Sequence, residues 1–133
     1  MKYGELKKKI RETFFENISD KQLSDIYIYQ YIWHAFSYET IDCLKEDKAN
    51  IEFDRQTYKH AWIFYEDDDF DTEALEIDST EWKAKDVFDL SRQFGKKRLP
   101  KDIYVVDCDF KWIYARTHEE DYGLGPYFYR KKR

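Results

Sequence analysis

The chain has 133 residues, which is enough for one domain with a hydrophobic core of its own. It is 38% charged but also 20% aromatic, and this aromatic content excludes the composition of a disordered chain. The formal net charge is −5 and the pI is about 5.3, an acidic balance that argues against a nucleic-acid-binding domain.

The lack of targeting signals and the small number of cysteines both bear on the cellular compartment of the protein. The residues after Met1 contain no continuous apolar stretch of a signal peptide, and no uncharged run approaches the length of a membrane span. Cys43 and Cys108 are too few for a disulfide scaffold and are expected to be free thiols. We therefore expect a cytoplasmic protein that does not bind a membrane.

The first half of the chain shows helical periodicity. Apolar residues recur every third or fourth position from Tyr3 to Ile18, which predicts an amphipathic helix with a basic outer face. A second helix is predicted to begin at the capping-box pattern of Ser19 and Gln22 and to present a broad apolar side. A strand or extended segment at 37–44 and a short helix at 45–56 are expected next.

The second half reads mainly as strands. They are predicted at 60–65, 74–77, 103–106, 111–115 and 127–129, with a helix at 85–94. This order predicts an α+β fold, in which N-terminal helices pack on a mostly antiparallel sheet of about four to six strands. No linker or repeat interrupts the chain, so residues 1–133 are expected to form a single domain with a flexible basic tail at 130–133.

The most informative feature is the acidic segment 66–82, which carries nine carboxylates and no Lys or Arg. Because the whole chain sums to −5, the other residues carry a net positive charge. Such segregated charge can steer or hold a basic partner. The expected binding surface consists of the residues at the start of the segment: Asp67, Asp68, Asp69, Asp71 and Glu73.

The same segment begins like a calcium loop. Asp67, Asp69 and Asp71 have the alternating spacing of that loop's first oxygen ligands. Thr72 stands where the loop requires Gly, however, and Asp78 stands where it requires a bidentate Glu. We therefore predict a solvated acidic turn, with no metal and no cofactor.

An enzyme is the alternative hypothesis. If the predicted second helix packs against the C-terminal hairpin, His34 and Glu39 could converge with His118 and Glu119. Such a group could act as general acid and base or bind a transition metal. The simpler interpretation is a core histidine at position 34 and a solvent-exposed run at 118–121. No nucleophile motif and no HExxH sequence is present. We expect the two histidines not to converge.

Basic clusters support a third hypothesis, a nucleic-acid-binding regulator. They lie at 96–98 and 130–133, and the acidic pI argues against this function. The glycines of Gly123–Pro126 are predicted to form a turn and not a phosphate loop, because Pro126 lacks a backbone N–H group.

Five short segments carry a resemblance to a known family: 31–39 (YIWHAFSYE), 104–107 (YVVD), 112–114 (WIY), 117–119 (THE) and 125–128 (GPYF). Together they resemble a family of small proteins, found mainly in Bacillus and related Firmicutes, that is described as a domain of unknown function. The resemblance covers about residues 20–131 and implies a bacterial, cytoplasmic, single-domain protein. It assigns no catalytic residue.

The leading hypothesis is a non-enzymatic protein-binding module. An acidic, aromatic-rich surface could hold a basic effector by charge complementarity and aromatic anchors, as an immunity or inhibitor protein would.

Overall fold

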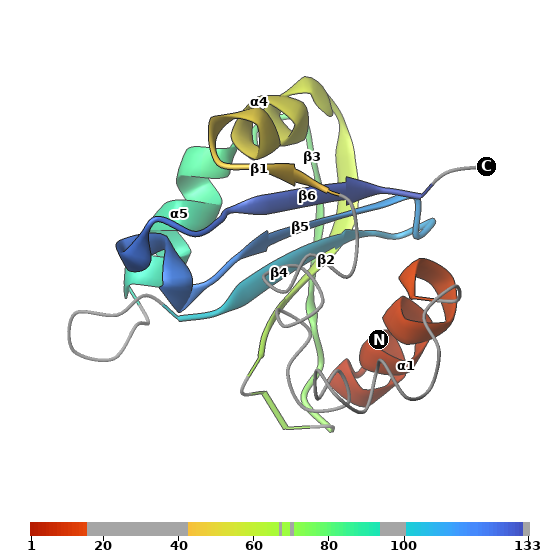
Figure 1. Cartoon of the computed structure of the whole chain (residues 1–133). Helices are drawn as coiled ribbons and strands as arrows, with labels where there is room; N and C mark the ends of the chain where they lie inside the picture. The colour runs from red at the N-terminus through yellow and green to blue at the C-terminus, as the bar shows by residue number, and fades with distance from the viewer. Residues whose placement is uncertain (16–42, 67, 70, 94–100, 132–133) are drawn as a thin grey trace.

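The computed structural model describes residues 1–15, 43–66, 68–69, 71–93 and 101–131. The described residues form an α+β fold around a six-stranded sheet in the order β1-β6-β5-β4-β2-β3, and all neighbouring strands are antiparallel (Figure 1). The strands are β1 (Leu44–Lys45), β2 (Lys59–Tyr65), β3 (Leu75–Ser79), β4 (Ile103–Asp107), β5 (Trp112–Arg116) and β6 (Tyr127–Arg130). The helices are α1 (Tyr3–Phe14), α4 (Asp47–Arg55), α5 (Ala84–Gln93) and the 3-10 helix η1 (His118–Tyr122).

Helix α1 covers one face of the sheet. Its apolar residues recur at helical spacing, and Tyr3, Leu6, Ile10 and Phe14 are all buried. They pack against the strand residues that point to this face: Phe64, Tyr104, Val106, Ile113, Ala115 and Tyr127. Of the basic residues between them, Lys8 and Lys9 are exposed, as the periodicity predicts, whereas Lys7 and Arg11 are half-buried.

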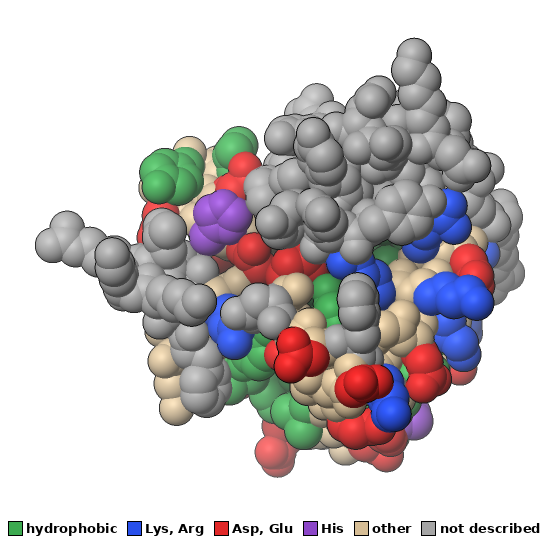
Figure 2. Space-filling model, turned by 90° about the horizontal axis from the view of Figure 1, so that it is seen from below, with side chains coloured by type: hydrophobic (Ala, Val, Ile, Leu, Met, Phe, Trp, Pro, Cys, Tyr) green, Lys and Arg blue, Asp and Glu red, His purple; other side chains and the backbone are tan. Residues whose placement is uncertain are grey.

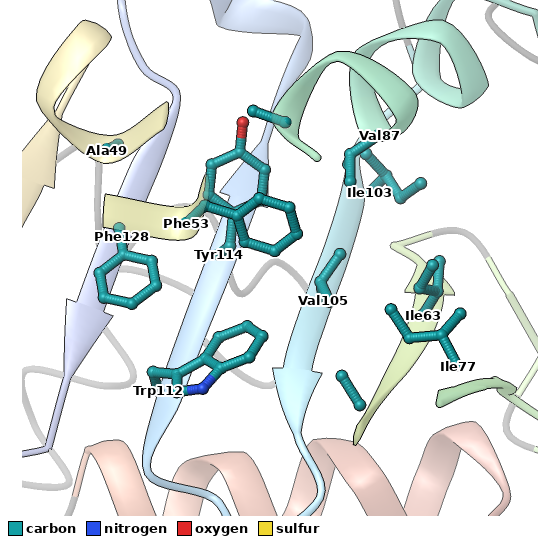
Figure 3. Packing of buried hydrophobic residues seen from close by; sticks show 12 residues of the cluster. Ala49, Phe53, Ile63, Ile77, Val87, Ile103, Val105, Trp112, Tyr114 and Phe128 are labelled. Carbon is teal, nitrogen blue, oxygen red and sulfur yellow. The ribbon is translucent and has the colours of Figure 1, made fainter. Parts of the chain in front are cut away.

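Helices α4 and α5 lie over the opposite face of the sheet (Figures 1 and 3). The core on this side combines aliphatic residues with four aromatic rings. Phe53 of α4 stacks on Tyr114 with ring centroids 4.3 Å apart and meets Trp112 edge-on at 5.8 Å. Because successive strand residues point to opposite faces, the central strands β4 and β5 are buried on both sides.

Most of the predicted elements that fall on described residues are confirmed. The helix at 45–56 and the strands at 60–65, 103–106 and 111–115 are present within two residues of their expected limits. Strand β3 is longer than expected and ends at Ser79. Arg130, placed in the flexible tail by the sequence, is the last residue of β6 and pairs with Trp112.

Parts of some predictions lie outside the described residues. These are the second helix from Ser19, the extended segment up to residue 42 and the end of the helix at 85–94. Within the described part of the chain, no helix is both long enough and apolar enough to cross a membrane.

Candidate functional site

Two carboxylates of strand β3 lie on the same face as His60. The register pairs His60 with Asp78 and Trp62 with Glu76, and the alternation of side chains puts both acids on one side of the sheet. His60 Nε2 lies 2.8 Å from Glu76 Oε1, and both side chains are about half exposed, at 46% and 49%. Glu76 and Asp78 therefore place two carboxylates on this edge of the sheet, and His60 partly neutralises their charge.

A third carboxylate comes from the turn between β4 and β5. The hydrogen bond to Glu76 raises the pKa of His60, and the nearby carboxylates of Asp78 and Asp109 act in the same direction. Asp109 is exposed and directly follows Cys108, whose N–H donates to the carbonyl of His60 at 2.9 Å. We call Glu76, Asp78 and Asp109 the acidic margin.

Cys108 lies within the same negative field. Burial raises the pKa of its thiol to about 11, and the carboxylates of Glu76, Asp107 and Asp109 add to this effect. A thiol with so high a pKa is protonated at neutral pH and is a poor nucleophile. Cys108 is a half-buried free thiol, as the sequence predicts.

An exposed aromatic side chain flanks the acidic margin. Tyr58 precedes β2, is 59% exposed and donates a hydrogen bond from its hydroxyl to Asp78. Leu75, at the other end of β3, is 55% exposed, but it alternates with Glu76 and so points to the opposite face of the sheet, the face of Ile77. Tyrosine combines a large apolar ring with a polar end and is common at protein interfaces. The margin thus offers both charge and apolar contact area.

The acidic turn predicted to be the binding surface is only partly available for binding. Asp69 and Asp71 are exposed, and Asp67 lies outside the described residues. Asp68 is half-buried, and its Oδ2 accepts a hydrogen bond from the N–H of Tyr65 at 2.9 Å. The turn uses this carboxylate to satisfy the backbone at the end of β2, a local role that sequence reasoning did not assign.

Glu73 is paired with the start of the chain. The ammonium group of Met1 lies 3.2 Å from its carboxylate, and Lys2 forms a β-bridge with Glu73. The side chain itself remains 67% exposed. The ammonium group of Met1 therefore offsets part of the negative charge of the turn. In the acidic margin, His60 pairs with Glu76 in a comparable way.

The alternative catalytic set cannot be assembled from the described residues. His34 and Glu39 lie outside them. His118 Nδ1 lies 2.9 Å from Asp102 Oδ1, which also accepts the backbone N–H of His118 at 2.7 Å. Asp102 therefore holds the start of η1 in place, and this role accounts for the pair. Each histidine visible in Figure 2 lies beside acidic side chains.

The run at 118–121 was expected to be exposed, and this prediction was wrong for most of it. Thr117 caps η1, and the helix turns Glu120 back toward the sheet. Arg116 donates to both oxygens of Glu120, at 2.6 and 3.2 Å, and the two side chains are only 7% and 11% exposed. Burial raises the pKa of Glu120, and Arg116 opposes that shift.

The network around Arg116 is structural. Its Nη1 donates to the Tyr114 hydroxyl at 2.7 Å and to Asn50 Oδ1 at 3.2 Å, and its guanidinium lies 4.8 Å from the centre of the Phe88 ring. These contacts join β5 to α4 and α5. Charged groups this well enclosed are unavailable to a substrate.

Neither a metal site nor a phosphate loop emerges from the described segments. No group of three or more His, Cys, Asp or Glu side chains within them could hold a metal ion. Gly123 and Gly125 both have positive φ and form a turn before β6, as predicted. A shallow open groove near the end of α1 is lined by two acidic side chains, Glu12 and Asp109, and by more basic ones: Lys9, Lys111, Arg130 and Lys131.

Comparison with known proteins identifies the family. Residues 1–128 match the family described as a domain of unknown function (DUF4275). The chain belongs to this family. No curated protein and no solved structure matches the chain. Because the description of DUF4275 names no activity, membership assigns no role to any residue.

Sequence reasoning on this DUF4275 chain missed the residues of the acidic margin as a group. The alternation in LEIDS (75–79) could have placed Glu76 and Asp78 on one face of a strand. Their proximity to His60 depends on the register with β2, and that of Asp109 depends on the neighbouring hairpin. No local pattern encodes either relation.

Proposed function

We propose that this DUF4275 domain is a protein-binding module that holds a basic segment of a partner protein at its acidic margin. The observation that carries the proposal is the placement of two exposed carboxylates, Glu76 and Asp78, on one face of the edge strand β3, with the exposed Asp109 of the β4–β5 turn near the same His60. Concentrated charge of one sign increases the rate of encounter with an oppositely charged partner.

The exposed ring of Tyr58 supports recognition over simple solvation, because it lies beside Asp78 and is 59% exposed. A polar rim around aromatic and aliphatic contacts is the usual composition of a protein interface. A lysine or arginine side chain could place its aliphatic part on Tyr58 and its charge beside the carboxylates.

An enzymatic function has less support. The His118–Asp102 pair serves to fix η1, and the buried ion pair of Arg116 and Glu120 joins elements of the fold. Cys108 lies opposite His60, but its thiol pKa of about 11 makes it a poor nucleophile. The acidic margin also lacks the three-ligand grouping that a metal-dependent reaction would need. Binding through the margin is therefore the function that the geometry favours.

A selection from a library of random peptides tests the proposal. The wild-type domain should enrich peptides that are rich in Lys and Arg. The triple variant E76Q/D78N/D109N should bind the same peptides about tenfold more weakly, because about 1.4 kcal/mol of charge interaction is lost. Its melting temperature should stay close to that of the wild type, because the exchanged side chains are exposed and keep their shape.

A matched variant controls for net charge. E46Q/D47N/D89N removes the same three charges from exposed positions at the start of α4 and on α5. It should bind the selected peptides as the wild type does. The proposal fails if the selected peptides have no basic bias, or if both triple variants lose affinity equally.

A further inference from the structure

The outer edge of β3 offers backbone hydrogen-bonding groups as well as charge. β3 is the last strand in the order of the sheet, and among the described strands it pairs only with β2. A terminal strand directs half of its N–H and C=O groups away from the sheet, and such groups can pair with an added strand. Which residues carry these groups follows from the register.

Two backbone hydrogen bonds define the directions within β2. The carbonyl of His60 accepts from Cys108 at 2.9 Å, and the N–H of Glu66 donates to Asp102 at 3.1 Å. The even-numbered residues of β2 thus direct their backbone groups toward β4. In an antiparallel sheet the groups of the intervening residues point the opposite way, toward β3.

The register between β2 and β3 shows which way the backbone N–H and C=O groups of each β3 residue point. Lys59, Ala61 and Ile63 lie opposite Ser79, Ile77 and Leu75, so these three β3 residues exchange the hydrogen bonds with β2. The backbone groups of Glu76 and Asp78 then point outward. The residues that carry the outward N–H and C=O groups are therefore the same two that contribute β3's carboxylates to the acidic margin.

The chain's own N-terminus already pairs with the continuation of this edge. The N–H of Tyr3 donates to the Thr72 carbonyl at 2.8 Å, and the N–H of Ala74 donates to the Met1 carbonyl at 2.9 Å. Thr72 and Ala74 have the same parity as Glu76, so they use the same side of the strand. The added segment carries Lys2, which lies opposite Glu73.

We propose that the open part of this edge binds a basic, extended segment of a partner protein as an added antiparallel β-strand. Its backbone pairs with Glu76 and Asp78, and its Lys or Arg side chains lie beside their carboxylates. This inference rests on the proposed function and specifies how the partner binds. The pairing of Met1–Tyr3 with 72–74 provides the pattern: an added segment with a basic residue opposite an acidic one.

Charge decides between a basic partner and a second copy of this chain. Pairing of two β3 strands would bring the carboxylates of Glu76 and Asp78 close to those of the other copy, and like charges across strands are destabilising. Charged residues on an edge strand are a common means of preventing self-association. A segment with alternating Lys or Arg meets no such repulsion.

Two substitutions at one position separate charge from backbone pairing. E76Q removes the carboxylate alone, whereas E76P also removes the outward N–H group. Proline is tolerated on an edge strand when its missing N–H would face solvent, so both variants should fold. The probe is an eight-residue peptide of alternating Lys and Thr, and a second peptide of the same sequence carries a methyl group on every backbone nitrogen.

Binding is measured by fluorescence anisotropy at low salt. We expect E76Q to weaken binding of the Lys-Thr peptide by a few-fold. E76P should weaken binding by about a further tenfold, because one hydrogen-bonding position is lost and its neighbours are disturbed. The N-methylated peptide has the same charge but cannot donate backbone hydrogen bonds. It should bind the wild type at least about tenfold more weakly than the unmodified peptide.

The outcomes distinguish the two proposals. If E76P equals E76Q and the N-methylated peptide binds as well as the unmodified one, strand addition is overturned while charge-based recognition stands. If neither charge nor methylation matters, the proposed function fails as well. Should sedimentation show a wild-type dimer that E76P separates, the edge binds a second copy and the inference is wrong. The methylated peptide provides the test on wild-type protein even if E76P does not fold.

Discussion

Charged side chains gather at both ends of the β4–β5 hairpin, but the two groups differ in burial and in pairing. At the open end, Arg116 and Glu120 are almost fully enclosed, and the guanidinium is also bound to Tyr114 and Asn50. At the turn end, Asp109 lies near the exposed acids of β3 and also lines an open groove with basic side chains, and His60 pairs with Glu76. Charges at the first end hold elements together, whereas charges at the second remain available.

This difference explains why one acidic run in the sequence can be structural and another can be a recognition surface. Glu119 and Glu120 follow Arg116 closely, and η1 folds the second of them onto that guanidinium. Glu76 and Asp78 alternate along an edge strand and are directed to solvent. Substitutions at the two ends should therefore differ in their effect on stability, with large losses at Arg116 and small losses at the acidic margin.

The largest effect is expected for R116M. Removing the guanidinium leaves Glu120 buried without its partner, so the free energy of unfolding should fall by about 3–5 kcal/mol. Urea denaturation measures this. R92M is the matched control, because Arg92 forms a more exposed ion pair with Asp121 and its loss should cost no more than about 1 kcal/mol. Equal effects would show that burial does not distinguish the two arginines.

A second effect concerns the buried Lys59, which donates to the carbonyls of Gln56 and Trp82 at 2.6 and 2.8 Å. Burial lowers its pKa to about 8 from 10.5. Because the unfolded chain retains this proton to higher pH than the folded protein, the contribution of Lys59 to stability rises as pH increases between these two values. The wild type should therefore gain stability relative to K59M from about pH 7 to about pH 10. A difference that is constant over this range, measured by urea denaturation, would contradict the shift.

Within the acidic turn, D68A and D71A should differ in their loss of stability. Asp68 accepts the N–H of Tyr65, and its removal leaves a half-buried donor unsatisfied, at a cost of about 1 kcal/mol. Asp71 is exposed, and its removal should change stability by less than about 0.5 kcal/mol. Thermal unfolding of the two variants tests the difference. Equal melting temperatures would mean that the hydrogen bond of Asp68 contributes nothing.

The smallest stability effect is expected at the margin, for H60Q. The hydrogen bond to Glu76 raises the pKa of His60 in the folded protein. Stabilisation from this source is fully present below the unfolded pKa of about 6.5 and is lost as pH rises through the folded value. The stability difference between wild type and H60Q should shrink from about pH 6 to about pH 8. A difference that grows with pH would reverse the sign of the argument.

The sequence predicts local elements well and their relations poorly. The spacing of Tyr3, Leu6, Ile10 and Phe14 is enough to place α1 and its buried face, because helical periodicity is a local property. The run HAWIFY likewise indicates β2. The contact of Met1 with Glu73 joins positions far apart in the chain, and nothing near either residue encodes it.

The candidate site shows the same limit. The charge count marks 66–82 as acidic, but it does not distinguish Asp68, which binds the backbone, from Glu76, which lies on an open edge. The assignment of 118–121 to solvent failed because the enclosing partner of Glu120 is supplied by β5 and is held there by α4 and α5. Local composition cannot reveal such tertiary pairing.

The central claim, that the acidic margin recognises a basic partner segment, is tested most directly by association rates. Stopped-flow mixing measures the rate at which the alternating Lys-Thr peptide binds at about 50 mM and about 300 mM salt. For the wild type and for E46Q/D47N/D89N, we expect a fast rate that falls steeply with salt. For E76Q/D78N/D109N, the rate should be about tenfold slower at low salt and nearly independent of salt. If the margin variant instead keeps the wild-type rate and salt dependence, the margin is not the recognition surface.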